Sequence, residues 1–392
     1  MTTVTEVEAA LASLAAELDQ EHLLDPRGFW STVAGEDSFR HLAGGIGDFN
    51  PLWWDTAYAV SGPRRGPTAP PVWLATVAMP YQHLLGLRPA GWSSLDGDVR
   101  WEYFEHVRPG DVLSATARLV EVERKNSRRL GEALLVRGSA DYRDQRRRLL
   151  ARSTAGLWFF PARAAAGGGR VRDGGEPEAS APLAGQVPSA GQVAPAGQVL
   201  SGGQVPSAGQ VPFDALGRLT RRGAEPRYGE HVEVGEEVTV LQRPTLSTFE
   251  LLAWCVGSGM SGFEPIARGE RADLRGLPNE LIEQRSVMRH LLPDLSRREG
   301  LSGGFDIGTQ RSAWIGQLVT DWMGDHGELV ELYCRFGRLL HVGDTPRCGG
   351  RVEESRREGG RWRVGLALWV RNQRGETVSE ASAVVSLPSL AA

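Results

Sequence analysis

The stretch Gln310-Arg311-Ser312-Ala313-Trp314-Ile315-Gly316-Gln317-Leu318-Val319-Thr320-Asp321-Trp322-Met323 decides the fold. Large apolar side chains recur along it at helical spacing, namely Trp314, Leu318, Val319 and Trp322. This spacing predicts a buried helix from about 310 to 323. Other parts of the fold are therefore expected to pack around this helix.

The segments after this helix have an order that also occurs earlier in the chain. Here the order is the turn 340–344, then an alternating strand, then the charged hairpin 370–374. The strand carries Trp362, Val364, Leu366 and Leu368. Earlier, the turn 107–111 leads into a strand with Leu113, Ala115, Ala117 and Leu119, followed by the charged hairpin 142–146. Apolar alternation predicts a half-buried antiparallel sheet, and its repetition indicates a duplicated domain.

The first half also has a candidate helix ahead of its strands. It begins near Pro70-Pro71, a favourable place for proline at a helix start, and runs toward Pro80. Its apolar side chains are Val72, Leu74, Val77 and Ala78. The predicted fold class is therefore α+β, with two antiparallel sheets that each wrap around a central helix.

A change of composition separates the two halves. Between residues 164 and 212 the chain turns to Gly, Ala, Pro, Ser and Gln, and Gly-Gln-Val recurs every six residues from 185 to 209. One valine per repeat could bury almost nothing, which favours a disordered linker over a β-helix. We expect an N-terminal domain at 1–165, a linker at 166–224 and a C-terminal domain at 225–392.

Composition excludes several classes of function. The formal charge of -4 over 392 residues does not favour a nucleic-acid partner. Three cysteines without CxxC spacing suit a reducing compartment, and the acidic amphipathic segment 1–24 lacks the features of a signal peptide. No window approaches the roughly 20 apolar residues of a membrane span. The expected location is the cytoplasm.

Several motifs together resemble a known family. They are 47–58, Ala69-Pro70-Pro71, 305–311 and 321–325. With the segments around them, they resemble MaoC-like acyl dehydratases whose N-terminal half is similar to fungal fatty-acid-synthase dehydratase domains. The resemblance implies a double hotdog fold and covers about 38–162 and 227–387. It also implies hydration of a trans-2-enoyl thioester, or dehydration of an (R)-3-hydroxyacyl thioester, on CoA or a carrier protein in fatty acid or polyketide metabolism.

The family pattern supplies an Asp, a His five residues later, and a Gly at the start of the buried helix whose N–H binds the developing oxyanion. In the first half, Asp48 and Asn50 match this pattern, but Trp53 occupies the His position. Pro71, which has no N–H, occupies the Gly position. The first half is therefore expected to hold an inactive site. Trp53 and Trp54 would either contact the acyl chain or simply cover this inactive site.

In the second half, the same spacing reaches His290 and Gly308, while Arg285 occupies the Asp position. The resemblance therefore implies His290 as general acid/base and Gly308 as oxyanion donor. The orienting carboxylate is then Asp306, Glu283 or, if the halves meet, Asp48. Each has a simpler role too, since Asp306 could cap a helix, Asp48 could form a turn before Asn-Pro, and His290 could lie at the surface.

Gln310 and Arg311 complete the expected substrate-binding set, beside Trp53 and Trp54. No histidine grouping suggests a metal, and no redox cofactor is implied. Gly257-Ser258-Gly259-Met260-Ser261-Gly262 satisfies GxGxxG, but it follows an apparent helix at 249–256 instead of a strand, which argues against dinucleotide binding.

Two other functions fit the same pattern. One is a catalytically inactive double hotdog that binds a thioester or supports a partner subunit, because neither half keeps Asp, His and Gly together. The other is a hotdog thioesterase that would use Asp321 on the buried helix. Partners would be the thioester itself and either a second copy or another hotdog subunit.

Overall fold

The computed structural model describes residues 4–24, 31–78, 80–127, 130–161, 221–259, 288–298 and 303–391. Glu283, Arg285, the end of the GxGxxG motif and all of the predicted linker before residue 221 lie outside these ranges. The only described part of that linker, 221–224, is fixed by hydrogen bonds: the N–H of Arg222 donates to the carbonyl of Asp321 at 2.8 Å.

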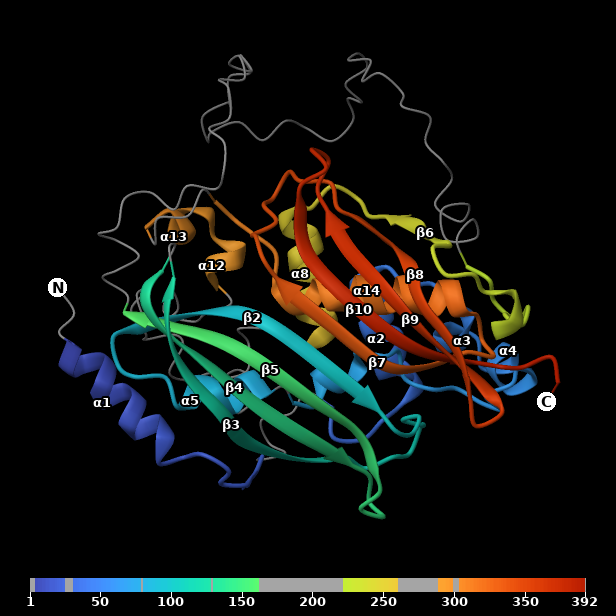
Figure 1. Cartoon of the computed structure of the whole chain (residues 1–392), viewed down its shortest axis with the longest axis horizontal. Helices are drawn as coiled ribbons and strands as arrows, with labels where there is room; N and C mark the ends of the chain where they lie inside the picture. Colours follow the sequence, from blue (N-terminus) through green and yellow to red (C-terminus); the bar gives the residue numbers. More distant parts are fainter. Residues whose placement is uncertain are drawn as a thin grey trace, which may run out of the picture.

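A single antiparallel sheet of ten strands joins the two halves, in the order β1-β3-β4-β5-β2-β7-β10-β9-β8-β6 (Figure 1). The first half contributes β1 His22–Leu23, β2 Trp92–Tyr103, β3 Ser114–Ser127, β4 Gly131–Arg143 and β5 Leu149–Pro161. The second half contributes β6 Glu237–Gln242, β7 Glu328–Phe336, β8 Arg347–Glu358, β9 Arg361–Arg371 and β10 Thr377–Leu387. The halves meet where β2 pairs with β7, from Asp98 opposite Arg335 to Glu102 opposite Glu331.

Both halves also contribute helices to the structure. The first half contains α1 Val4–Ala15, α2 Glu36–Ile46, α3 Pro51–Trp54, α4 Thr56–Ser61, η2 Trp73–Thr76 and α5 Pro80–Gly86. The second contains η3 Gly229–His231, α8 Thr248–Ser258, α12 Met288–Leu291, α13 Pro293–Arg298 and α14 Gly308–Met323. All residues of α14 are buried, which confirms the helix predicted at 310–323 and extends it by two residues.

The prediction of one continuous helix from Pro70-Pro71 toward Pro80 is wrong. Residues 73–76 form the 3-10 turn η2, and α5 begins separately at Pro80. The physical reason is Pro80, whose ring has no N–H to donate to Thr76 and clashes with a helical carbonyl four residues back. The apolar side chains of η2 are nevertheless buried, as the sequence indicated.

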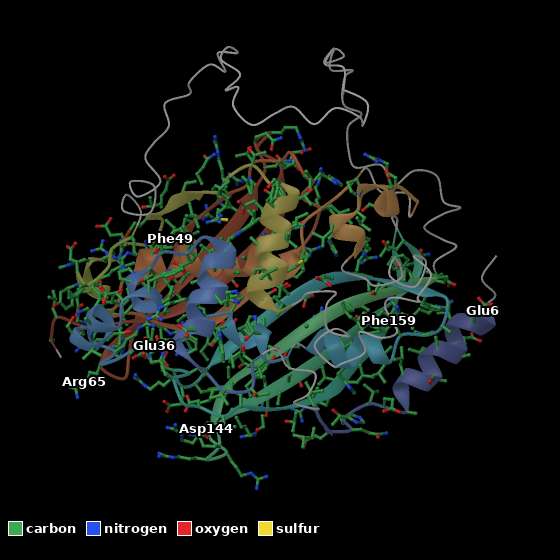
Figure 2. All side chains as sticks on the ribbon, turned by 180° about the vertical axis from the view of Figure 1, so that it is seen from behind. Glu6, Glu36, Phe49, Arg65, Asp144 and Phe159 are labelled. Atoms are coloured by element: carbon green, nitrogen blue, oxygen red, sulfur yellow. The ribbon has the colours of Figure 1, made fainter. Side chains whose placement is uncertain are left out.

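The turns predicted at equivalent places have the same hydrogen bonds. In the first half, Asp111 accepts the N–H of Arg108 at 2.8 Å, and the side chain of Gln145 accepts the N–H of Val112 at 2.9 Å. Gln145 belongs to the β4–β5 hairpin. Asp144, labelled in Figure 2, closes this hairpin by accepting the backbone N–H groups of Arg146 and Arg148.

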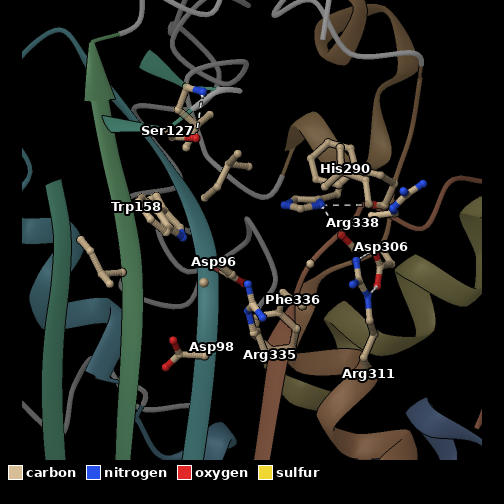
Figure 3. Close-up of a pocket in the computed structure, with 18 of the residues that line it drawn as sticks. Asp96, Asp98, Ser127, Trp158, His290, Asp306, Arg311, Arg335, Phe336 and Arg338 are labelled. Atoms are coloured by element: carbon tan, nitrogen blue, oxygen red, sulfur yellow. Dashed lines mark hydrogen bonds and ion pairs between the residues drawn. The ribbon is translucent and has the colours of Figure 1, made fainter. Parts of the chain in front are cut away.

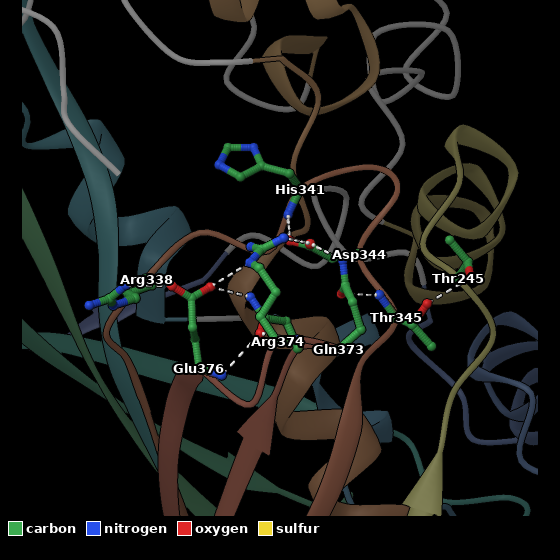
Figure 4. Close-up of polar contacts among 9 residues, drawn as sticks. Thr245, Arg338, His341, Asp344, Thr345, Gln373, Arg374 and Glu376 are labelled. Carbon is green, nitrogen blue, oxygen red and sulfur yellow. Dashed lines mark hydrogen bonds and ion pairs between the residues drawn. The ribbon is translucent and has the colours of Figure 1, made fainter. Parts of the chain in front are cut away.

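The second half repeats these bonds. Asp344 accepts the N–H of His341 at 3.0 Å, and Gln373 of the β9–β10 hairpin accepts the N–H of Thr345 at 2.8 Å (Figure 4). The glycine before each aspartate has positive φ, 92° at Gly110 and 98° at Gly343, a conformation that favours glycine. Two turns that agree bond for bond support the duplication inferred from sequence.

The helices α2 and α8 cross at two glycines. A Cβ on Gly45 would lie 2.8 Å from the carbonyl oxygen of Ala253, and one on Gly257 would lie 2.9 Å from the Cα of Gly45. The first glycine of the GxGxxG motif is therefore needed for helix packing. Gly259 ends α8 in the left-handed conformation.

None of the described helices combines the length and the apolar character needed to cross a membrane.

Candidate active site

A cavity of about 420 Å³ lies where the two halves meet. It is bounded by β2 and β5 of the first half and by β7, the α12 region and the start of α14 (Figure 3). The sequence-predicted residues that line it are His290, Gly308, Asp306 and Arg311. Gln310, Trp53, Trp54 and Asp48 do not line this cavity.

His290 is held by backbone carbonyls rather than by a carboxylate. Its Nδ1 lies 3.1 Å from the carbonyl oxygen of Phe305 and 2.9 Å from that of Asp306. Because both partners are acceptors, Nδ1 carries the hydrogen, which leaves Nε2 as an acceptor. Burial, assisted by the Arg289 charge, lowers the pKa of His290 to about 3. The imidazole is therefore neutral at physiological pH.

Gly308 begins α14 and borders the cavity. The first N–H groups of a helix have no partner within the helix and carry the positive end of its dipole, so they suit a developing negative charge. A Cβ here would lie 2.9 Å from the Phe336 ring and 3.0 Å from Oδ2 of Asp96. Only glycine fits at this position without displacing a neighbour.

Asp96 is the residue that the sequence analysis missed. It lies on β2 of the first half and lines the cavity with His290 and Gly308 (Figure 3). Burial raises the pKa of Asp96 to about 6, although Arg289 and Arg311 act in the opposite direction. The β2–β5 register shifts between Asp96 and Asp98, a bulge at Gly97. A carboxylate beside a glycine within a strand was the available signal, since bulges often re-aim side chains near active sites.

Asp306 does not orient His290 with its carboxylate, and this corrects the expectation that Asp306 is the orienting carboxylate. Its carboxylate forms a buried ion pair with Arg311, whose Nη2 donates to Oδ1 at 2.5 Å and whose Nε donates to Oδ2. Arg311 also donates to the carbonyl of Val378 and the hydroxyl of Ser379, both at 3.0 Å. The helix cap considered for Asp306 is not formed either, because Ile307 is the N-cap of α14. The pair fastens α14 to β10.

Gln310 is also placed differently from the expectation of substrate contact. It is fully buried, and its side-chain Nε2 lies 3.4 Å from the carbonyl oxygen of Glu250. Arg311 borders the cavity, but its guanidinium is occupied by Asp306.

The loop 47–55 of the first half is a closed structural unit. Trp53 donates its indole N–H to Oδ2 of Asp48 at 2.8 Å, and the N–H of Asn50 donates to Oδ1 at 3.0 Å. Asn50 in turn caps α3 by accepting the N–H of Leu52. Trp54 donates to the carbonyl of Asp48 at 2.7 Å. The indole N–H groups of both tryptophans are therefore bonded within the loop. Asp48 has the turn-forming role considered for it.

Further buried charges fill the space behind this loop. Burial raises the pKa values of both Asp48 and Asp321, and the nearby charge of Asp48 adds to the rise at Asp321. Arg243 reaches across from the second half and donates to the carbonyl of Ile46 and to Gln317. Asp321 is therefore part of a buried charge cluster and does not border the His290 cavity.

Comparisons with known proteins agree with this architecture. The family model of the "FAS1-like, dehydratase domain region" matches residues 28–152. A MaoC-like dehydratase structure covers 96% of this chain and 99% of its own, with 17% identity and a TM-score of 0.64. A MaoC domain protein dehydratase from Chloroflexus aurantiacus has 13% identity and a TM-score of 0.55, with 95% of each chain covered.

A third structure, a Mycobacterium tuberculosis protein described as a double hotdog, has 14% identity and a TM-score of 0.52. It covers 95% of this chain and 97% of its own. The comparison with curated proteins gave no match. These structures share the fold, and the family model covers the first half, including the loop 47–55. The chain therefore has the double hotdog fold of these dehydratase structures, and its residues 28–152 are similar to the FAS1-like dehydratase domain region.

Proposed function

We propose that the chain is an acyl-thioester hydratase or dehydratase, which interconverts trans-2-enoyl and 3-hydroxyacyl thioesters of the (R) series implied by the family resemblance. The observation that carries the proposal is the meeting of three groups in one cavity: His290, the start of α14 at Gly308, and Asp96 from the other half. They supply a water acceptor, an oxyanion donor and a carboxylate.

The two proton acceptors have different strengths. The pKa of His290 is lowered to about 3, whereas that of Asp96 is raised to about 6, so the carboxylate is the stronger base. We assign Nε2 of His290 to accept a hydrogen bond from water and thereby position it. Asp96 then takes a proton from this water as its oxygen adds to C3 of the enoyl group, and returns the proton to C2.

In the dehydration direction, Asp96 removes the C2 proton and delivers it to the departing hydroxyl group. The N–H of Gly308 stabilises the enolate oxygen in both directions, because the same intermediate forms. One proton moves between water and C2 through the carboxylate, so the site needs no other co-reactant.

The mouth of the cavity suits a phosphorylated thiol carrier. Lys125, Arg335 and Arg338 line it, and the negative charges of CoA or of a carrier protein's phosphopantetheine would be favoured there. The apolar contacts are Leu130, Leu135, Trp158 and Phe336, which could border an acyl chain.

The test is a spectroscopic assay of the purified full chain. Mixed with enoyl-CoA substrates of increasing chain length, the wild-type protein should remove the enone absorbance. Asp96→Asn and His290→Ala should each lower kcat by about a hundredfold or more. His231→Ala, a change to an exposed histidine outside the cavity, is the matched control and should keep full activity.

Retained activity in His290→Ala and Asp96→Asn would overturn the site assignment. A wild-type protein that alters no enoyl thioester, on CoA or on phosphopantetheine, would instead favour the inactive double hotdog. Release of free thiol would identify a thioesterase.

A further inference from the structure

A second large pocket, of about 410 Å³, lies beyond the opposite end of α14. It is formed by the first-half segments 63–65 and 106–108 and by residues 325–328, which follow the helix. Since α14 rises about 1.5 Å per residue, the helix separates this pocket from Gly308 by roughly 24 Å. Among the described residues, no lining residue is shared with the His290 cavity.

Four arginines line this pocket: Arg64, Arg65, Arg108 and Arg361. None of them is within ion-pair distance of a carboxylate in the described part of the chain, whereas most other described arginines are. Asp325 and Glu328 also border the pocket but are outnumbered. Oδ2 of Asp325 already accepts the Tyr58 hydroxyl.

Neutral oxygens hold three of these guanidinium groups in place. Arg64 donates to the Thr68 hydroxyl at 3.1 Å and to the Gly327 carbonyl at 3.4 Å. Arg361 donates to Ser386 at 2.7 Å and to the His326 carbonyl at 3.1 Å. Arg108 donates to the carbonyl of Arg64 at 3.0 Å. Such bonds fix the orientation of the groups without neutralising their charge.

Burial shifts the pKa values of two titratable groups in the pocket. It lowers the pKa of Arg64 to about 10, while Asp325 and Glu328 oppose this shift more strongly than Arg108 adds to it. Burial, reinforced by Arg64 and Arg108, lowers the pKa of His106 to about 4. The charge of a bound anion would oppose the repulsion that Arg64 and Arg108 exert on a protonated His106.

A small cavity of about 50 Å³ adjoins the pocket, and the two share Arg64 and His106. It extends toward Pro70 and Pro71, where the first half lacks an oxyanion donor. A reactive thioester therefore has neither room nor a catalytic group here. The charged pocket in front of it remains open.

We propose that this pocket is a binding site for a phosphate-bearing ligand, separate from the His290 cavity and without chemistry of its own. Fixed guanidinium groups match phosphate oxygens in pairs, and several of them together favour a phosphomonoester or diphosphate over a single carboxylate. The phosphate could come from free pyrophosphate or from the diphosphate of a nucleotide-linked thiol such as CoA.

The experiment measures binding of sodium pyrophosphate, and separately of CoA, to the full chain by titration calorimetry. Wild-type protein should bind pyrophosphate, and the Arg65→Ala/Arg108→Ala variant should bind at least about tenfold more weakly. Both side chains are exposed, so the fold should tolerate their loss, which thermal unfolding will verify. Affinity should also decrease with added salt.

Two variants make the result specific. Arg351→Ala removes an exposed arginine from β8 and should leave pyrophosphate affinity unchanged. Arg335→Ala/Arg338→Ala alters the mouth of the His290 cavity and should also leave it unchanged. If CoA also binds more weakly to Arg65→Ala/Arg108→Ala than to wild type, the nucleotide-linked thiol is a ligand of this pocket. If only the affinity for pyrophosphate decreases, free pyrophosphate is the source.

The proposal is overturned if wild-type protein does not bind pyrophosphate, or if Arg65→Ala/Arg108→Ala binds it as tightly as wild type. Neither criterion involves hydratase activity. The proposal of phosphate binding can therefore be overturned while the proposed His290 site stands, and the His290 site can be overturned while phosphate binding stands.

Discussion

Oδ2 of Asp96 lies 3.0 Å from the point that a Cβ on Gly308 would occupy, although the two residues belong to different halves of the chain. The pairing of β2 with β7 brings them together. A carboxylate supplied by the first half thus lies at the N-terminus of the central helix of the second. The first half contributes to the proposed site even though its own catalytic pattern is lost.

Gly308→Ala tests this contact. The new methyl group must displace the Asp96 carboxylate or the Phe336 ring, while the backbone N–H is retained. Small displacements of reacting groups are costly, so we expect kcat to fall by about ten- to a hundredfold. Gly316→Ala is the control within the same helix, since its Cβ would meet neighbours at an ordinary 3.7 Å. That variant should keep its activity and gain about 0.5–1 kcal/mol in stability. Equal activities in the two variants would argue against the contact.

The pH dependence of the rate should report the ionisation of Asp96. Because the ionised carboxylate acts in both directions, kcat/KM should rise with pH through about 6 for hydration and for dehydration. His290, with a pKa of about 3, contributes no limb above pH 4.5. Asp96→Asn should leave a flat residual profile across pH 5–8. An unchanged limb in that variant would assign the ionisation to another group.

The same substitution should increase stability at neutral pH. A carboxyl group whose folded pKa is raised to about 6 favours folding below the unfolded pKa near 4, and this contribution is lost as pH rises through 6. Asp96→Asn removes the ionisation, so its free energy of unfolding at pH 7.5 should exceed that of wild type by about 2–3 kcal/mol. At pH 4 the two proteins should be nearly equal. Urea unfolding at both pH values measures the difference, and a variant that is less stable at pH 7.5 would contradict the raised pKa.

Breaking the Asp306–Arg311 pair should act on stability first. Both side chains are almost completely buried, and removing one partner leaves a buried charge uncompensated. We expect Asp306→Asn to cost about 3 kcal/mol in free energy of unfolding. Glu353→Gln, which breaks the exposed pair with Arg351, should cost less than about 0.5 kcal/mol. Denaturant unfolding compares the two. Similar costs would show that burial does not strengthen the Asp306 interaction.

The sequence predicted the elements that local patterns determine. The apolar spacing of Trp314, Leu318 and Trp322 predicted α14, and the alternation from Leu113 to Leu119 predicted the buried face around β3. The helix expected at 70–80 was divided because the same apolar pattern fits a 3-10 turn, and Pro80 ends the hydrogen-bonding run.

The predictions of the site depended on which residues meet in space. Spacing alone found His290 and Gly308, which line one cavity. It could not find Asp96, since the β2–β7 pairing joins residues more than two hundred positions apart. It also offered Asp306 as the orienting carboxylate, because spacing does not show that the Arg311 side chain, five residues later, pairs with it.

Restoring histidine at position 53 should not restore a first site. Trp53 is buried, and its indole N–H satisfies Asp48, so Trp53→His should cost about 2–4 kcal/mol in stability. The oxyanion donor would still be missing, because Pro71 has no N–H and its ring lies 3.7 Å from the position of a Cβ on Gly316. In a His290→Ala background, Trp53→His should therefore show no more enoyl-thioester hydration than His290→Ala alone. The enone absorbance assay makes this comparison directly, with the folded fraction of each variant checked by circular dichroism. Recovery of activity in the double variant would mean that the loop 47–55 retains a working site, and that the histidine alone had been lost.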